Sequence, residues 1–96
     1  SITLGKPYPN PTQSNSSISF TLPENVTGKY NVVLDVYDLV GNKITTLANG
    51  QLSPGFHSRQ WNPEQHQMSS GLYIYNLMVI DNSNKKILTE KIIIQK

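Results

Sequence analysis

Apolar and polar residues alternate with a period of two along most of this chain. Residues 18–22 (ISFTL) place Ile18, Phe20 and Leu22 on one side and hydroxyl side chains on the other. Such alternation is typical of a β-strand with one buried face. No segment of useful length shows the i, i+3, i+4, i+7 spacing of an amphipathic helix. The pattern therefore predicts a protein built from strands.

Seven strands are predicted, at residues 1–4, 18–22, 30–38, 43–48, 56–61, 71–80 and 85–96. Gly41 and Asn42 tolerate the positive φ of a tight hairpin turn, and the carboxylate of Asp38 can accept hydrogen bonds from that turn. The strand 71–80 is apolar on both faces, which predicts a central position. Short strands separated by turn signals every 8–12 residues or so predict an all-β fold, an antiparallel immunoglobulin-like β-sandwich of about seven strands.

The predicted core follows from the apolar face of each strand. The chain has no cysteine to join the sheets, so we expect Trp61 and the tyrosines to fill that space. Asp35 and Tyr37 are expected to face outward. The predicted core residues are Ile18, Phe20, Leu22, Val32, Leu34, Val36, Leu47, Trp61, Tyr73, Tyr75, Leu77, Ile92 and Ile94.

Length and charge narrow the possible classes of protein. A chain of 96 residues makes one small domain, spanning residues 1–96, and no apolar stretch is long enough to be a transmembrane helix. The net charge is only +2, but four lysines fall within the last twelve residues. These lysines fit either an acidic partner or a solvated edge strand on which lysine prevents unwanted pairing. No aromatic residues lie among them, so we expect no nucleic acid partner.

Candidate chemistry is sparse. His57 and His66 do not stand at the spacing of a metal motif, the carboxylates are scattered, and no nucleophile or phosphate-loop motif occurs. We therefore expect a non-catalytic domain without a metal or cofactor. His57, Arg59 and Trp61 share one strand face, which fits either a sugar-stacking surface or a buried Trp61 covered by the arginine stem.

The segment YPNP (residues 8–11) predicts a connection of unusual stiffness. The three prolines of residues 7–11 lack N–H groups, and a residue before proline favours an extended conformation. We expect residues 7–11, the strap, to run extended between the first two strands. The side chain of Tyr8 should lie against the sandwich edge, and the Asn10 amide should bond to nearby backbone. The strap is then either a plain crossover or a rigid feature that a receptor recognises.

The motifs YPNP, ISFTLPE, VYDLVGNKI, LSPGFHSRQW, SGLYIYNL and KIIIQK occur in an order that resembles the C-terminal sorting domain of the type IX secretion system. The resemblance extends from about Leu4 to Lys96 and includes the related immunoglobulin-like domain of flagellar hook-capping proteins. Hook-capping domains often carry Asp-Gly after the tryptophan. This chain has WNPEQHQ (residues 61–67) instead, which favours the sorting domain.

The resemblance implies a secretion signal without catalytic activity. It implies an N-terminal cargo domain carried across the outer membrane, with transit through the periplasm and delivery to the cell surface or the medium. The implied partners are the type IX machinery and its sortase-like protease, and the membrane is reached only indirectly, by attachment of the cargo to lipopolysaccharide. The alternative is an accessory immunoglobulin-like spacer or carbohydrate-binding module of an extracellular hydrolase.

Three parts of the chain are the candidate signal. The resemblance points to a Pro-Asn-Pro box, a Gly-x-Tyr box and a basic closing strand. In addition, three consecutive isoleucines exceed what one buried strand face needs, so Ile93 should point away from the side that Ile92 and Ile94 face. There it is either exposed to another protein or covered by a loop. The predicted recognition residues are Pro9, Asn10, Pro11, Gly71, Tyr73, Lys91, Ile93 and Lys96.

Overall fold

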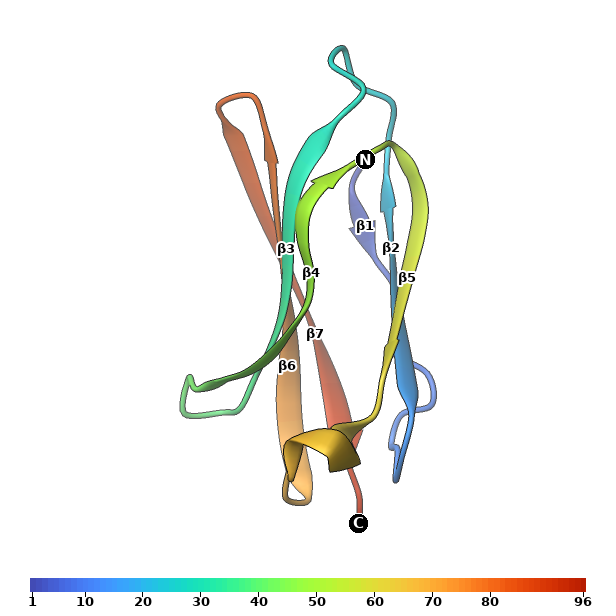
Figure 1. The fold of residues 1–96 in the computed structure, drawn as a ribbon, viewed down its shortest axis with the longest axis vertical. Helices are drawn as coiled ribbons and strands as arrows, with labels where there is room; N and C mark the ends of the chain where they lie inside the picture. The colour runs from blue at the N-terminus through green and yellow to red at the C-terminus, as the bar shows by residue number, and fades with distance from the viewer.

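A computed structural model describes residues 1–96 as two antiparallel sheets packed face to face (Figure 1). The strands are β1 (Thr3–Leu4), β2 (Ser16–Leu22), β3 (Tyr30–Tyr37), β4 (Lys43–Leu52), β5 (Gly55–Trp61), β6 (Gly71–Asp81) and β7 (Asn84–Ile94). One sheet has the order β1-β2-β5 and the other β4-β3-β6-β7, so β6 is central as predicted. A short 3-10 helix, η1 (Pro63–His66), joins β5 to β6. The predicted seven-stranded sandwich is confirmed.

The core lies between the two sheets and matches the prediction at every position except Leu47. Leu47 is half-buried, and its neighbour Ala48 is buried instead. Ala48 pairs with Leu34, whereas Thr46 pairs with Asp35, so Leu47 is the extra residue of a β-bulge. A bulge inverts the alternation of the strand, and a pattern with strict period two cannot foresee it. The core residues that the sequence pattern missed are Tyr30, Ala48, Met68 and Val79.

Asp35 is buried, contrary to the expectation that it would face solvent. Its side chain lies on the outer face of the four-stranded sheet but is only 6% exposed. The Thr46 hydroxyl donates to Asp35 Oδ1 at 2.6 Å, and the Tyr37 hydroxyl donates to Oδ2 at 3.4 Å. Thr46 on β4 and Tyr37 on β3 cover the carboxylate, and each donates a hydrogen bond to one of its oxygens, as buried polar groups require.

Trp61 and Tyr75 connect the two sheets. Trp61 ends β5 of the three-stranded sheet and is 6% exposed, and its indole Nε1–H donates to the Tyr75 hydroxyl on β6 at 2.7 Å. The rings meet edge to face at 6.2 Å between centroids. Burial raises the pKa of Tyr75 above its ordinary value, and hydrogen bonding with Trp61 and Ser16 opposes part of that rise. A buried hydrogen bond thus joins the sheets where many sandwiches have a disulfide.

The β3–β4 hairpin is held by one carboxylate, as predicted. Asp38 Oδ1 accepts from the backbone N–H groups of Val40 and Asn42 at 3.0 and 2.8 Å, and Oδ2 accepts from the Asn42 side chain at 3.0 Å. Gly41 supplies the positive φ of 94° that the turn requires. The Asn42 backbone bond is the largest of the contributions that lower the pKa of Asp38.

We expect Tyr75→Phe to lower the free energy of unfolding by about 1–3 kcal/mol, because the Trp61 N–H would stay buried without an acceptor. Urea denaturation followed by the fluorescence of Trp61, the single tryptophan, measures this change. Tyr8→Phe is the matched control, since the Tyr8 side chain is 79% exposed, and it should unfold like the parent protein. Equal stability of the parent and Tyr75→Phe would contradict a contribution from this bond.

We expect Asp38→Asn to destabilise the domain at neutral pH and to have less effect in acid. The folded pKa of Asp38 lies below its ordinary value, so the charged form stabilises the fold above the unfolded pKa of about 3.9. That contribution is lost as the pH falls through the folded pKa. The melting temperatures of parent and variant should therefore differ at pH 7 and converge below about pH 3.9. A difference that is constant with pH would show that the charge is not involved.

Candidate recognition site

The structure gathers the eight predicted recognition residues at the end of the sandwich where the C-terminus lies (Figure 1). Gly71 and Tyr73 begin β6, directly opposite Ile94 and Ile92 near the end of β7. Asn10 contacts the backbone of the same part of β7, and the Lys96 N–H donates to the Ser70 hydroxyl at 2.9 Å. Three segments that are far apart in the sequence therefore lie side by side at this end of the domain.

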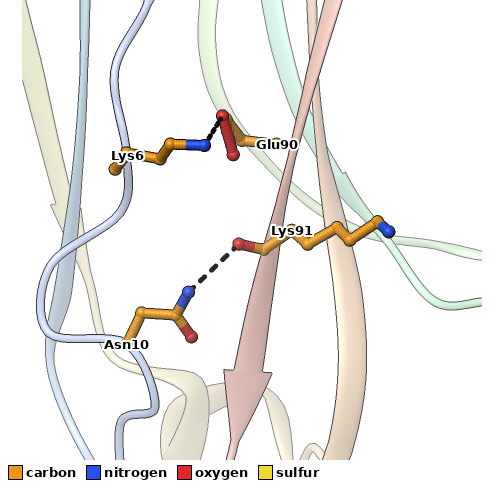
Figure 2. A network of polar contacts seen from close by, with 4 residues as sticks. All are labelled: Lys6, Asn10, Glu90 and Lys91. Atoms are coloured by element: carbon orange, nitrogen blue, oxygen red, sulfur yellow. Dashed lines mark hydrogen bonds and ion pairs between the residues drawn. The ribbon is translucent and has the colours of Figure 1, made fainter.

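Asn10 satisfies backbone groups on the open edge of β7. Its Oδ1 accepts from the Ile93 N–H at 2.8 Å, and its Nδ2 donates to the Lys91 carbonyl at 3.4 Å, the contact drawn in Figure 2. Lys91 and Ile93 are alternate residues of an edge strand, so these groups point away from β6. The side-chain amide thus takes the place of a residue in a neighbouring strand. The expected bond from Asn10 to nearby backbone is confirmed.

Thr12, which follows the strap, continues this pairing along β7. Its N–H donates to the Ile93 carbonyl at 2.9 Å, and its carbonyl accepts from the Gln95 N–H at 2.8 Å. At the other end of the strap, Tyr8 exchanges two backbone bonds with Ser17 of β2, at 2.9 and 2.8 Å. Within a few residues the chain therefore leaves the three-stranded sheet and joins the edge of the four-stranded sheet.

Two details of the strap differ from the sequence prediction. The chain bends at residues 9–11 instead of running extended, and the peptide bonds before Pro9 and Pro11 are cis. The bend is needed because the chain must turn from one sheet to the other. The side chain of Tyr8 points to solvent, because residues paired across a sheet share a face and its partner Ser17 is on the outer face of β2.

Buried hydroxyl groups hold the strap from the inside, and the sequence analysis did not identify them. The Ser16 hydroxyl is buried and donates to the Pro9 carbonyl at 3.1 Å. Thr12 is buried as well, and its hydroxyl donates to the Asn15 carbonyl at 2.8 Å while accepting from the Ser14 N–H at 3.2 Å. Ser16 also lies beside Tyr75, so the strap is connected to the bond that joins the sheets.

The Gly-x-Tyr box has a structural explanation. Gly71 has a φ of 153°, which side chains rarely adopt. Tyr73 is buried, and its hydroxyl donates to the carbonyl of Ser69, four residues earlier, at 2.8 Å. This arrangement is similar to the tyrosine corner of immunoglobulin-like sandwiches, in which a tyrosine near the start of a strand bonds to upstream backbone. The box therefore sets the geometry at the start of β6.

The exposed part of the site lies on and just after β7. Ile93 is 44% exposed, whereas its neighbours Ile92 and Ile94 are buried, as the sequence predicted. Lys91 and Lys96 are exposed beside it. Further along the strand, Lys6 Nζ forms an ion pair with Glu90 Oε1 at 3.0 Å (Figure 2). No local signal predicts this pair, because its members are 84 positions apart and meet only when the strap lies along β7.

The other candidate chemistry does not converge on a site. Trp61 is buried, as the second interpretation of its strand face expected, so its indole is not available to stack on a sugar. The His57 ring stacks on Phe20 at 5.3 Å with its Nε2 2.8 Å from the Ser53 carbonyl, and the His66 ring lies 5.8 Å from that of Trp61. No group of three or more His, Cys, Asp or Glu side chains is arranged to hold a metal ion. The structure has no helix of the length and hydropathy that crossing a membrane requires.

We expect Asn10→Ala to accelerate hydrogen exchange of the Ile93 amide roughly two- to tenfold, because that N–H loses its acceptor. Exchange measured residue by residue by NMR tests this. The Ile92 amide is the internal control, since it faces β6, and its exchange should change little. Unchanged exchange at Ile93 would show that Asn10 does not protect the strand edge.

A comparison with known protein families finds one match, to the family described as the secretion system C-terminal sorting domain, over residues 6–95. A search among curated proteins finds no match to the chain. The matched region contains the strap, the strands from β2 to β7 and the polar contacts between the strap and β7. The chain therefore belongs to the secretion system C-terminal sorting domain family and carries a sorting signal for type IX secretion.

Proposed function

We propose that the type IX machinery recognises the C-terminal end of the folded domain, with Pro9, Asn10, Pro11, Gly71, Tyr73, Lys91, Ile93 and Lys96 as the residues that form or support the signal. The observation that carries the proposal is the bonding of Asn10 and Thr12 to the edge of β7. This bonding holds the last strand in one position, so that its outward side chains present a fixed shape to a receptor.

The recognition residues divide into two groups by exposure. Lys91, Ile93 and Lys96 are exposed and available for contact with a receptor, and an apolar side chain beside two basic groups suits binding to another protein. Asn10, Gly71 and Tyr73 act by holding β6, β7 and the strap in place. Substitutions in the first group should affect recognition alone, whereas those in the second should affect local structure as well.

The two ends of the domain lie far apart, which suits a cargo at one end and a receptor at the other. The domain is 44 Å long, and Ser1 lies far along it from the C-terminal end (Figure 1). A cargo domain preceding Ser1 would therefore leave the proposed receptor site free. In this proposal the cargo and its sorting domain pass through the periplasm and cross the outer membrane together. A sortase-like protease then cleaves the chain between the cargo and the sorting domain. The cargo is released, or is attached to lipopolysaccharide at the cell surface.

The test fuses residues 1–96 behind a periplasmic reporter in a host with a type IX system. We expect the parent fusion to reach the cell surface or the medium. The variant Ile93→Ser with Lys96→Ala should be exported about tenfold more slowly and melt like the parent, because both side chains are exposed. The matched control, Val26→Ser with Lys29→Ala, changes an exposed apolar–basic pair elsewhere and should be exported normally.

Two outcomes would contradict the proposal in different ways. Export of the Ile93→Ser, Lys96→Ala variant at the parental rate would show that the last strand is not the signal, and the Pro9-Asn10-Pro11 strap would become the leading candidate. Retention of the parent fusion in the periplasm would favour an accessory spacer of a larger extracellular protein.

A further inference from the structure

Three strands of the four-stranded sheet, β3, β6 and β7, carry many apolar side chains on the outer face, whereas the outward residues of β4 are polar. Apolar side chains lie across these three strands in register, with Leu72 beside Ile93, and Met78 between Val33 and Ile87. Ile87 is 53% exposed and Ile93 44%, and the others are half-buried. We call this surface the outer apolar face; its members are Val33, Tyr37, Leu72, Ile74, Met78, Ile80, Ile87 and Ile93.

The other sheet of the same domain shows what a solvated face looks like here. The outward residues of its strands are almost all small and polar, with the exception of Phe56, and Tyr8 adds a second aromatic side chain beside Ser17. The outward residues of the strands are Thr3, Ser17, Ser19, Thr21, Phe56, Ser58 and Gln60. An antiparallel sheet with one face on the core normally carries polar residues on the other. The sandwich therefore does not require an apolar outer face. Contact of this face with another molecule would explain why only one of the two sheets has apolar residues there.

The charges around the outer apolar face have one sign. Lys43, Lys85 and Lys91 lie at its margin and are exposed. The only carboxylate on this face is Asp35, which is buried and bonded to Thr46 and Tyr37. Glu90 lies on the opposite side of β7, where it pairs with Lys6. A partner that meets this face therefore encounters apolar side chains on both sides of a polar row, formed by Asp35, Asn76 and Thr89, and a basic rim.

We propose that the outer apolar face binds a second protein that presents an apolar surface surrounded by carboxylates. The inference rests on the proposed function, because the partner would be a receptor in the export machinery. It extends the recognised surface from the C-terminal end to the outer face of β3, β6 and β7. Strand spacings of about 4.8 Å and rises of about 3.3 Å per residue give such a face an area on the order of 500 Å². This is below the ~800 Å² that each partner contributes to a standard interface, and it suits a transient complex.

Two other occupants fit the face less well. A membrane would have to cover the polar row of Asp35, Asn76 and Thr89 in the middle of the face, and lipid tails offer no hydrogen bonds to replace water. A second copy of the domain would bring one lysine rim against another, and like charges disfavour such a contact. A protein can supply hydrogen-bonding groups to the polar row, apolar side chains to the residues on either side of it, and carboxylates to the rim.

The test uses the reporter fusion with substitutions in the half of the face that is far from the C-terminus. We expect Lys85→Glu with Ile87→Ser to slow export about tenfold without changing the melting temperature. The control, Lys86→Glu with Phe56→Ser, makes the same changes in charge and polarity outside the face and should be exported normally. Lys85 and Lys86 both line the cavity of about 560 Å³ at that end of the domain. If a charge change at this cavity slowed export, the control variant would therefore be slowed as well.

Three results would overturn the inference. If Lys85→Glu with Ile87→Ser is exported normally while Ile93→Ser with Lys96→Ala is retained, the proposed function stands and the face is not a docking surface. Retention of the parent fusion contradicts both. Face-dependent binding of the purified fusion to phosphatidylcholine vesicles containing phosphatidylglycerol, or face-dependent dimers in sedimentation, would identify a different occupant.

Discussion

The hydrogen bonds between the strap region and the edge of β7 determine the shape of the C-terminal end of this domain. An edge strand exposes unpaired N–H and C=O groups, and it stays in place only if something covers or pairs them. Here the side chain of Asn10 and the backbone of Thr12 supply that pairing, from Lys91 to Gln95. Because Tyr8 is paired to β2 at the same time, the connection also fixes the distance between the two sheets at this end.

The interior supports the strap with a second set of bonds. The Ser16 hydroxyl holds the Pro9 carbonyl and lies beside Tyr75, which accepts the indole N–H of Trp61. Each of these polar groups is buried with a partner, and satisfied buried groups favour one arrangement over others. A domain without cysteine thus obtains a specific junction between its sheets from hydrogen bonds. A substitution that weakens the Trp61–Tyr75 hydrogen bond should therefore also make the strap less ordered.

The family match shows a sorting domain, and in the function proposed above its signal is a folded surface rather than a short linear peptide. The residues proposed for recognition come from the strap, from β6 and from β7, and they are adjacent only after folding. The apolar face of the four-stranded sheet begins at the same place, at Leu72 and Ile93, and continues along β7 to Ile87. Two neighbouring surfaces, one at the C-terminal end and one on the sheet, are thus available on a single rigid support.

The sequence alone was sufficient for the class of fold, the strands, most of the core and the outward direction of Ile93, because period-two alternation and turn residues are local properties of a chain. The family resemblance also predicted Asn10, Gly71 and Tyr73 as recognition residues. The tertiary structure decided how these residues act. The contact of Asn10 with β7 and the ion pair of Lys6 with Glu90 depend on which edge the strap meets, and the burial of Asp35 depends on neighbours from two strands. A single bulge exchanged Leu47 for Ala48 in the core. These features arise from contacts between distant segments, and no local pattern encodes them.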